Sequence, residues 1–275
     1  MNKALKLKML VLTGLMFLLP SCSTVPITGR RQFNLVPDSM VNAMALQEYS
    51  NFIAQSKLSG NAQQTQTVKQ VGGRISQAVE KFNAENNIEQ KYDWEFNLVE
   101  DDAVNAWAMP GGKVVIYTGI LPLTQDETGL AVVVGHEIAH AWARHGSERM
   151  SQGLMVQMGG IALSEALSKY PAQTQNLFMQ AFEVGSQVGV LLPYSRRHEE
   201  EADHLGLIFM ALAGYDPQAA VDFWQRMAAA KEAPAPPEFL STHPSDETRI
   251  KKIKERIPEA LKYYRQNVGS PGGPL

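Results

Sequence analysis

The chain has 275 residues, of which 44% are hydrophobic and 19% are charged, so it can form a buried core and is not wholly disordered. The formal net charge of −3 gives no basis for a nucleic-acid partner. The single cysteine excludes an internal disulfide and a metal site made only of cysteines.

Residues 1–21 have the organisation of a signal peptide. Lysines precede the apolar run Met9–Leu19, which is shorter than the roughly 20 residues of a membrane-spanning helix. The run ends just before Cys22, and this resembles a bacterial lipoprotein processing site with a lipid on the cysteine sulfur. We therefore expect a lipid-anchored, periplasm-facing protein of a bacterial cell envelope, with Ser23 favouring the outer membrane. A plain secretory signal is the alternative.

The rest of the chain predicts one domain with short extensions. Residues 22–36 are expected to form a tether, residues 37–266 the domain, and residues 267–275 a disordered tail. Hydrophobic periodicity, caps and turn residues predict the individual elements. Helices are expected over residues 38–56, 62–83 (weakened by Gly72 and Gly73), 129–145, two within 151–192, 195–213, 245–257 and 258–266, and strands over 92–99, 104–109 and 113–118.

The predicted fold class is α+β, mainly helical, with one small and mostly antiparallel sheet beside the helix over residues 129–145. Thr124 and Glu127 match a capping box that would open this helix, and Gly146 would close it.

The stretch His136-Glu-Ile-Ala-His140 carries the chemistry. Residues i and i+4 of a helix lie on the same face, so both imidazoles can bind one zinc ion. Glu137 lies about 100° around the helix, where it can take a proton from a zinc-bound water and pass it to the leaving amine. The apolar segment Leu130–Val134 indicates a buried helix, in which these polar groups need partners or a ligand. A surface His-Glu-His run at a helix end is the alternative.

A zinc site of this kind needs a third protein ligand and an open position for water. His145 is nearest, but on a continuous helix it faces away from His136. Glu199 and Asp203 are spaced i and i+4, so Glu199 can bind zinc while Asp203 accepts a hydrogen bond from the far nitrogen of a ligand histidine. Glu201 is the alternative ligand, although no carboxylate follows it one turn later. A solvated acidic face is the other alternative.

Four stretches carry a family resemblance: Asn105–Lys113, Gly135–His140, Ser195–Asp203 and Ser241–Pro244. They resemble the gluzincin metallopeptidase family that contains the HtpX proteases, the CAAX prenyl endopeptidases and the Oma-type proteases, and within it the bacterial periplasmic lipoprotein branch. The resemblance implies a zincin-like domain with Glu199 as the third ligand. Isoprenylated substrates are not implied, because the chain has no second long apolar run.

The region around the Pro110–Gly112 turn is a candidate substrate-binding segment. In proteases of this kind an exposed strand beside the metal pairs with the substrate backbone. Met109, Gly111 and Gly112 are the residues expected to contact the peptide, because glycines allow close approach of another backbone. An ordinary hairpin is the alternative.

His243 is the remaining candidate site residue. It precedes Pro244 in a predicted loop, and the family resemblance supports a role in the site. It can stabilise the oxyanion that forms on the scissile carbonyl, or it can occupy the open zinc position and hold the enzyme inactive. A loop histidine that caps the next helix is the alternative. Arg249 either orients the same loop or is a surface charge.

The sequence therefore predicts a zinc-dependent endopeptidase with one zinc ion per chain, in which Glu137 assists attack of zinc-bound water on a peptide bond. Expected substrates are unfolded or misassembled proteins of the cell envelope. One alternative is a periplasmic chaperone or assembly factor on the same scaffold, although such a protein would not need Glu137. The other is a protease latched by His243.

Overall fold

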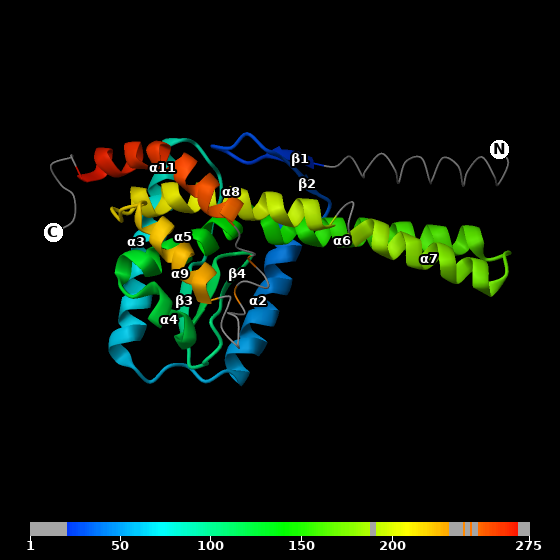
Figure 1. Ribbon diagram of the computed structural model, residues 1–275, viewed down its shortest axis with the longest axis horizontal. Coiled ribbons are helices and arrows are strands. Elements are labelled where there is room, and N and C mark those ends of the chain that lie inside the picture. The colour runs from blue at the N-terminus through cyan, green and yellow to red at the C-terminus, as the bar shows by residue number, and fades with distance from the viewer. Residues whose placement is uncertain (1–20, 188–190, 231–238, 240–242, 244–246, 269–275) are drawn as a thin grey trace. The chain divides into compact units, whose positions relative to one another are not determined.

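The structure is a computed structural model that describes residues 21–187, 191–230, 239, 243 and 247–268. It is mainly helical with two small sheets, which confirms the expected α+β class (Figure 1). The helices are α2 (Asp38–Gln55), α3 (Ala62–Glu85), η1 (Thr118–Ile120), α4 (Leu121–Thr124), α5 (Glu127–Trp142), α6 (His145–Leu167), α7 (Ala172–Ser186), α8 (Leu192–Leu212), α9 (Ala219–Ala230) and α11 (Glu247–Val268). The strands are β1 (Ser21–Thr24), β2 (Arg31–Asn34), β3 (Glu95–Val99), β4 (Ala106–Met109) and β5 (Lys113–Tyr117).

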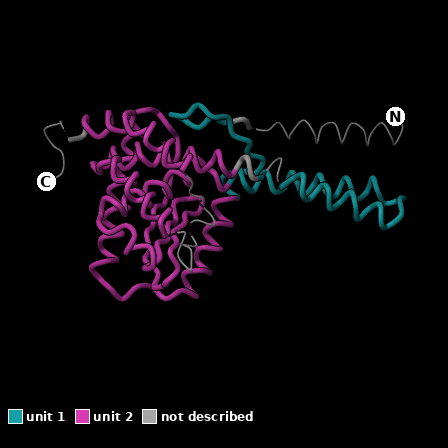
Figure 2. The backbone as a smooth tube through the Cα atoms, viewed as in Figure 1, with its two compact units in different colours: residues 1–40, 147–191 teal, residues 41–146, 192–275 magenta. Residues whose placement is uncertain are grey.

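The chain forms two compact units (Figure 2). The larger comprises residues 41–146 and 192–275, and the smaller comprises residues 1–40 and 147–191. The larger unit contains the three-stranded sheet and helices α5 and α8. The predicted signal peptide up to residue 20 and the tail residues 269–275 lie outside the described residues.

The three-stranded sheet has the order β3-β5-β4. Strand β5 pairs in parallel with β3 and antiparallel with β4, so one of the two pairings in this sheet is parallel. Residues Val114, Val115 and Ile116 of β5 are completely buried, as expected for a central strand covered on both faces. Strand β4 is therefore an edge of the sheet, and it packs against α5.

Helix α5 begins two residues later than the predicted capping box implies. The cap is Asp126, whose carboxylate accepts a hydrogen bond from the Gly129 N–H at 2.8 Å. The capping role predicted for Thr124 is wrong, because Thr124 is the last residue of α4 and Gln125, with a φ of 68°, turns the chain between the two helices.

Two helices that the sequence predicted to be weakened or divided are continuous. Helix α3 continues through Gly72, where a Cβ would lie 2.4 Å from the Phe96 ring, so the glycine admits this ring from β3. Helix α11 is one helix with Pro258 inside it, instead of two. Ile253 and Ala260 are buried on either side of this proline, and α11 packs along α8.

In the smaller unit, the segment expected to be a tether contains a hairpin. Strands β1 and β2 pair antiparallel, with Cys22 opposite Phe33. Arg30 forms an ion pair with the buried Glu148 at 2.8 Å, and the Leu35 N–H donates to Ser151 at 2.9 Å. These bonds join the hairpin to the first turns of α6 that belong to the same unit.

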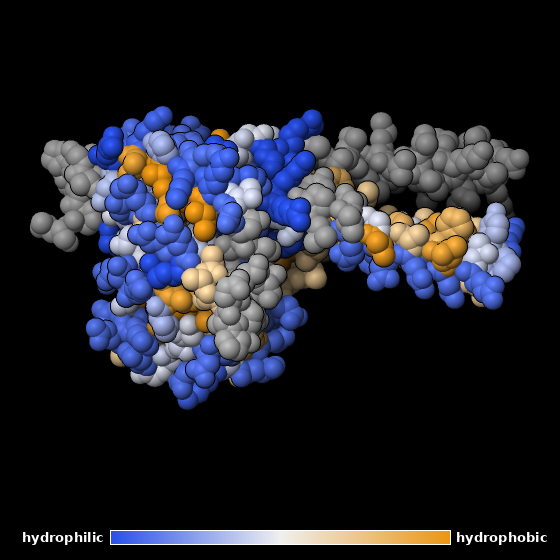
Figure 3. Space-filling model, in the orientation of Figure 1, coloured by the Kyte–Doolittle hydropathy of each residue, from blue (hydrophilic) through white to orange (hydrophobic). Residues whose placement is uncertain are grey.

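Helices α6 and α7 of the smaller unit carry hydrophobic side chains on their surface (Figure 3). The exposed residues are Leu154, Met155, Met158, Ile161, Leu177, Phe178 and Val184. In the part of the chain that the structure describes, no helix combines the length and the apolar character needed to cross a membrane.

Helices α5 and α8 cross at two glycines. A Cβ on Gly135 would lie 2.9 Å from the Gly206 carbonyl oxygen, and a Cβ on Gly206 would lie 3.0 Å from the backbone nitrogen of His136. The two backbones are therefore in direct contact, which brings α8 close to the histidines of α5.

We expect Gly135→Ala to lower the free energy of unfolding by about 1–3 kcal/mol, because the added methyl group has to displace backbone. Urea denaturation measures the change. The control is Gly73→Ala in α3, where a Cβ meets nothing within 4 Å. That substitution should raise the free energy of unfolding by about 0.5–1 kcal/mol. Equal stability changes in the two variants would contradict the close crossing.

Candidate metal centre

Helix α5 carries two histidines and a glutamate although the helix is buried on every side. All residues from Gly129 to Trp142 are buried. The Nε2 atoms of His136 and His140 lie 3.0 Å apart, as the i, i+4 spacing predicts. Polar groups in such surroundings have to be paired or ligated, and the structure supplies their partners from later parts of the chain.

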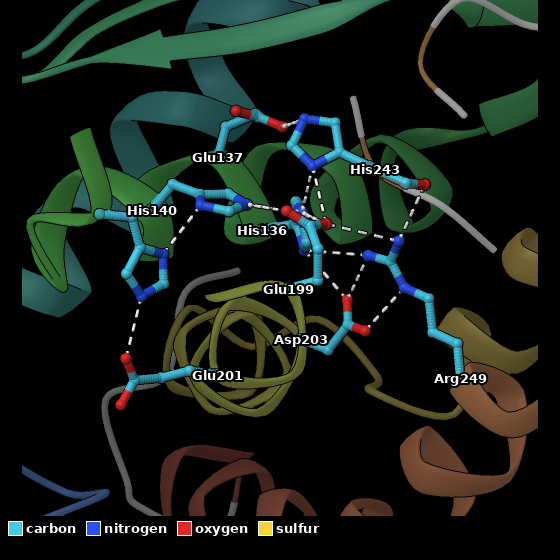
Figure 4. Close-up of polar contacts among 9 residues, drawn as sticks. His136, Glu137, His140, Glu199, Glu201, Asp203, His243 and Arg249 are labelled. Atoms are coloured by element: carbon cyan, nitrogen blue, oxygen red, sulfur yellow. Dashed lines mark hydrogen bonds and ion pairs between the residues drawn. The ribbon is translucent and has the colours of Figure 1, made fainter. Parts of the chain in front are cut away.

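Glu199 of α8 faces both histidines (Figure 4). Its two carboxylate oxygens lie 3.3 Å from the Nε2 atoms of His136 and His140, one oxygen to each. Glu201, the alternative ligand, instead lies 2.9 Å from His145 and does not join this group. Of the two carboxylates, the structure therefore places Glu199 with the histidines.

His243 completes the group from the segment between α9 and α11. Its Nδ1 atom lies 2.8 Å from Glu199 and 3.1 Å from Nε2 of His136, while its Nε2 atom lies 3.5 Å from Glu137. The ring stacks on Phe239 with 4.4 Å between centroids. His243 thus lies between Glu137 and Glu199 (Figure 4).

Together, His136, His140, Glu199 and His243 form a buried group whose ligand atoms all lie within 4.8 Å of one another. Imidazole nitrogens and carboxylate oxygens are ligands for divalent transition metals. The donor set present in this chain therefore fits a bound metal ion.

Asp203 supports His136 from behind, as the spacing predicts. Its carboxylate lies 3.0 Å from Nδ1 of His136, the nitrogen that faces away from the group. Arg249 of α11 donates two hydrogen bonds to the same carboxylate, both at 2.7 Å, and a third to the His243 carbonyl oxygen at 3.1 Å. Its guanidinium lies 3.4 Å above the Trp224 ring centroid. Arg249 is thus a buried structural link and not a surface charge.

His145 is a site residue that the helical periodicity missed. Helix α5 ends at Trp142, and Arg144 adopts a φ of 55°, so the chain leaves the helical path before His145. The expectation of one helix through residue 145 is therefore wrong. The His145 ring returns to the site, where its Nδ1 lies 2.8 Å from Nδ1 of His140. A break of this kind has no mark in the sequence, because arginine does not favour a positive φ.

The charges in the group oppose the effect of burial. Burial lowers the pKa of His136, but hydrogen bonds to Asp203 and Glu199 outweigh it and raise the pKa to about 9. Burial together with the neighbouring histidines holds the pKa of His140 well below its usual value despite the attraction of Glu199. Burial raises the pKa of Glu199, but the surrounding histidines lower it well below its ordinary range. Glu199 is therefore anionic and His140 neutral, the forms in which a carboxylate and an imidazole can bind a metal.

The predicted substrate segment lies at the edge of the sheet. Met109 is the last residue of β4, and Gly111 and Gly112 form the turn that follows, with φ values of 87° and 96°. The carbonyl groups of these two glycines accept hydrogen bonds from Asp93 and Glu95. The glycines thus form the turn and attach it to Asp93 and to the first residue of β3.

Replacing Arg249 by methionine should lower the free energy of unfolding by about 3–5 kcal/mol, because the buried Asp203 carboxylate would lose both hydrogen bonds from the guanidinium. Urea denaturation with and without the second change Asp203→Asn measures the effect, and the double variant should recover part of the loss. The control is Lys252→Met, which breaks the exposed ion pair with Glu200 and should cost less than about 1 kcal/mol. A loss no larger than that of the control would contradict the structural role of Arg249.

Comparison with known proteins shows similarity to named endopeptidases. The chain is 35% identical over 242 residues to the mitochondrial metalloendopeptidase OMA1 of Schizosaccharomyces pombe, covering 86% of this chain and 66% of the relative. It is 31% identical over 245 residues to human OMA1, covering 86% of this chain and 46% of the relative. The beta-barrel assembly-enhancing protease of Yersinia pestis is 32% identical over 165 residues, covering 58% of this chain and 34% of the relative. The chain thus spans about two thirds or less of the length of these relatives.

These relatives contradict the predicted location at a bacterial outer membrane. The fungal and human proteins are named as mitochondrial. The prediction depended on a few residues around Cys22, and a pattern this short does not fix a compartment. Lipidation of Cys22 itself stays a prediction.

The family follows from a match that covers more than half of the chain. The pattern of Peptidase family M48 covers residues 69–257, a span that begins in α3 and includes every residue of the buried group. The chain therefore belongs to peptidase family M48.

Proposed function

We propose that this chain is a zinc-dependent endopeptidase that hydrolyses peptide bonds in polypeptide substrates. The observation that carries the proposal is the convergence of His136, His140 and Glu199 in one buried group, with Glu137 beside it on the same helix. Two imidazoles and a carboxylate are a ligand set of hydrolytic zinc sites. The names of the relatives support the same class of reaction.

The proposed zinc ligands come from two helices, α5 and α8. His136 and His140 would hold zinc through Nε2, and Glu199 would hold it through its carboxylate. Bound zinc supplies a Lewis acid that polarises a carbonyl group and lowers the pKa of water. Asp203 keeps a proton on Nδ1 of His136, so a metal ion at Nε2 would displace only the Nε2 proton.

Glu137 is the proposed general base. It follows His136 directly on α5, so its side chain lies about 100° from that histidine around the helix axis and does not join the ligand group. There the carboxylate can take the proton from the attacking water and return it to the leaving amine. The side chain is only 2% exposed, which limits competition from bulk solvent.

The edge strand β4 is the proposed docking strand for the substrate. Among the described strands it pairs only with β5, and it packs against α5. An extended peptide can add to such an edge through backbone hydrogen bonds. Since the carbonyls of Gly111 and Gly112 are already engaged, the pairing falls to β4 itself up to Met109.

The proposal covers polypeptides as a class. The envelope substrates and the lipoprotein branch expected from the sequence depended on the location that the relatives contradict, and neither forms part of it.

Glu137→Gln should reduce cleavage of an unfolded protein about 10²–10⁴-fold, because the amide cannot accept the proton. The amide keeps the size of the side chain, so the metal content should not change. A dye-labelled unfolded substrate measures cleavage, and elemental analysis measures metal per chain. Undiminished cleavage by a metal-containing Glu137→Gln protein would contradict the role of Glu137.

We further propose that His243 acts as a latch. The specific observation is that Nδ1 of His243 shares the buried group with three proposed ligands, at 2.8 Å from Glu199. In this position it would occupy the place that the substrate carbonyl or the water needs. The alternative role, oxyanion stabilisation, requires the ring to point at the substrate.

His243→Ala should therefore increase cleavage of the unfolded protein while the metal content stays at the wild-type level, since three ligands remain. The matched control is His204→Ala, which removes a histidine of α8 that pairs with Glu259 outside the group. It should leave cleavage unchanged. Decreased cleavage in a metal-containing His243→Ala protein would refute the latch and favour oxyanion stabilisation.

A further inference from the structure

The two proposed histidine ligands are supported in different ways. His136 meets the carboxylate of Asp203 directly at 3.0 Å. His140 instead meets a second imidazole, His145, at 2.8 Å between their Nδ1 atoms. Nε2 of His145 in turn lies 2.9 Å from Glu201 (Figure 4). The support of His140 is therefore a chain of two side chains that ends in a carboxylate.

The two side chains that support His140 are buried, and their orientation is fixed by several contacts. The side chains of His145 and Glu201 are 0% and 4% exposed. The His145 ring also stacks on His198, with 4.3 Å between centroids and 18° between the planes. The stacking and the carboxylate together fix the plane of the His145 ring and the direction of both its nitrogens.

The hydrogen-bond partners define the tautomers. An ionised carboxylate can only accept, so Glu201 requires a proton on Nε2 of His145. Nδ1 of neutral His145 then carries a lone pair and accepts the Nδ1 proton of His140. Nε2 of His140 is left with a lone pair, and this atom faces Glu199 at 3.3 Å.

We propose that His145 and Glu201 are positioning residues that hold His140 in the tautomer and orientation that bind metal. This inference depends on the proposed metal-dependent function and extends it to two residues outside the ligand set. It also accounts for the burial of Glu201, the carboxylate that the sequence offered as an alternative ligand. Two carboxylates on one helix, Glu199 and Glu201, would thus serve the metal at different distances, one directly and one through two imidazoles.

The experiment compares zinc affinity among purified full-length variants by competition with a chromophoric chelator. His145→Phe keeps an aromatic ring but removes the acceptor for His140, and it should weaken zinc binding about 10–100-fold. His145→Gln restores a side chain that both accepts and donates, so it should recover most of the affinity. The matched control is His204→Phe, which breaks a His–Glu pair of similar geometry, 2.8 Å long, that does not reach the group. Its zinc affinity should equal that of the wild type.

Cobalt substitution gives a second readout that loss of packing alone would not move. The visible absorption of bound Co²⁺ depends on ligand geometry, so it should change in His145→Phe and match the wild type in His204→Phe. If His145→Phe does not fold, the double variant His145→Phe/Glu201→Leu removes the carboxylate together with the imidazole that it meets, and it should show the same loss of zinc affinity.

The outcomes separate this inference from the proposed function. Wild-type zinc affinity and an unchanged cobalt spectrum in His145→Phe, or in the double variant, would overturn the positioning role while leaving the metal site intact. An equal loss in His204→Phe would also overturn it, because the effect would then follow from any broken His–Glu pair. Absence of zinc binding by the wild-type chain would instead refute the proposed function.

Discussion

The need to satisfy polar side chains on a fully buried helix governs the centre of this molecule. Helix α5 has no exposed face between Gly129 and Trp142, yet it carries two imidazoles and a carboxylate. Each unpaired group in such a place costs several kcal/mol, roughly the order of a domain's whole stability. The polar side chains of α5 contact partners from α8, from α11 and from the segment around His243.

These partners form successive layers around α5. Glu199 and His243 meet the inward nitrogens, and Asp203 and His145 meet the outward ones. A further layer then meets the second, with Arg249 paired to Asp203 and Glu201 hydrogen-bonded to His145. Long-range pairing of this kind joins segments more than a hundred residues apart, such as His136 and His243. The larger unit is thus held together through the same contacts that define its chemistry.

The sequence predicted the parts of the site that obey local periodicity. The i, i+4 spacing placed His136 with His140, and the same spacing on a later helix placed Asp203 behind His136. Residues that depend on non-local geometry were harder to assign. His145 reaches the site because Arg144 leaves the helical region, and Arg249 reaches it because α11 packs along α8. The parallel pairing of β3 with β5 is equally invisible in the strand pattern, since alternation gives the faces of a strand but not its neighbours.

The glycine crossing of α5 and α8 has a consequence for how such a protein can diverge. Because Gly135 and Gly206 place backbone against backbone, the spacing between the two helices does not depend on the rotamers or volumes of the surrounding apolar side chains. The core can therefore drift in sequence while the distance between Glu199 and the two histidines is conserved. The crossing therefore sets the spacing between α5 and α8, and most of the remaining core can change in sequence without altering that spacing.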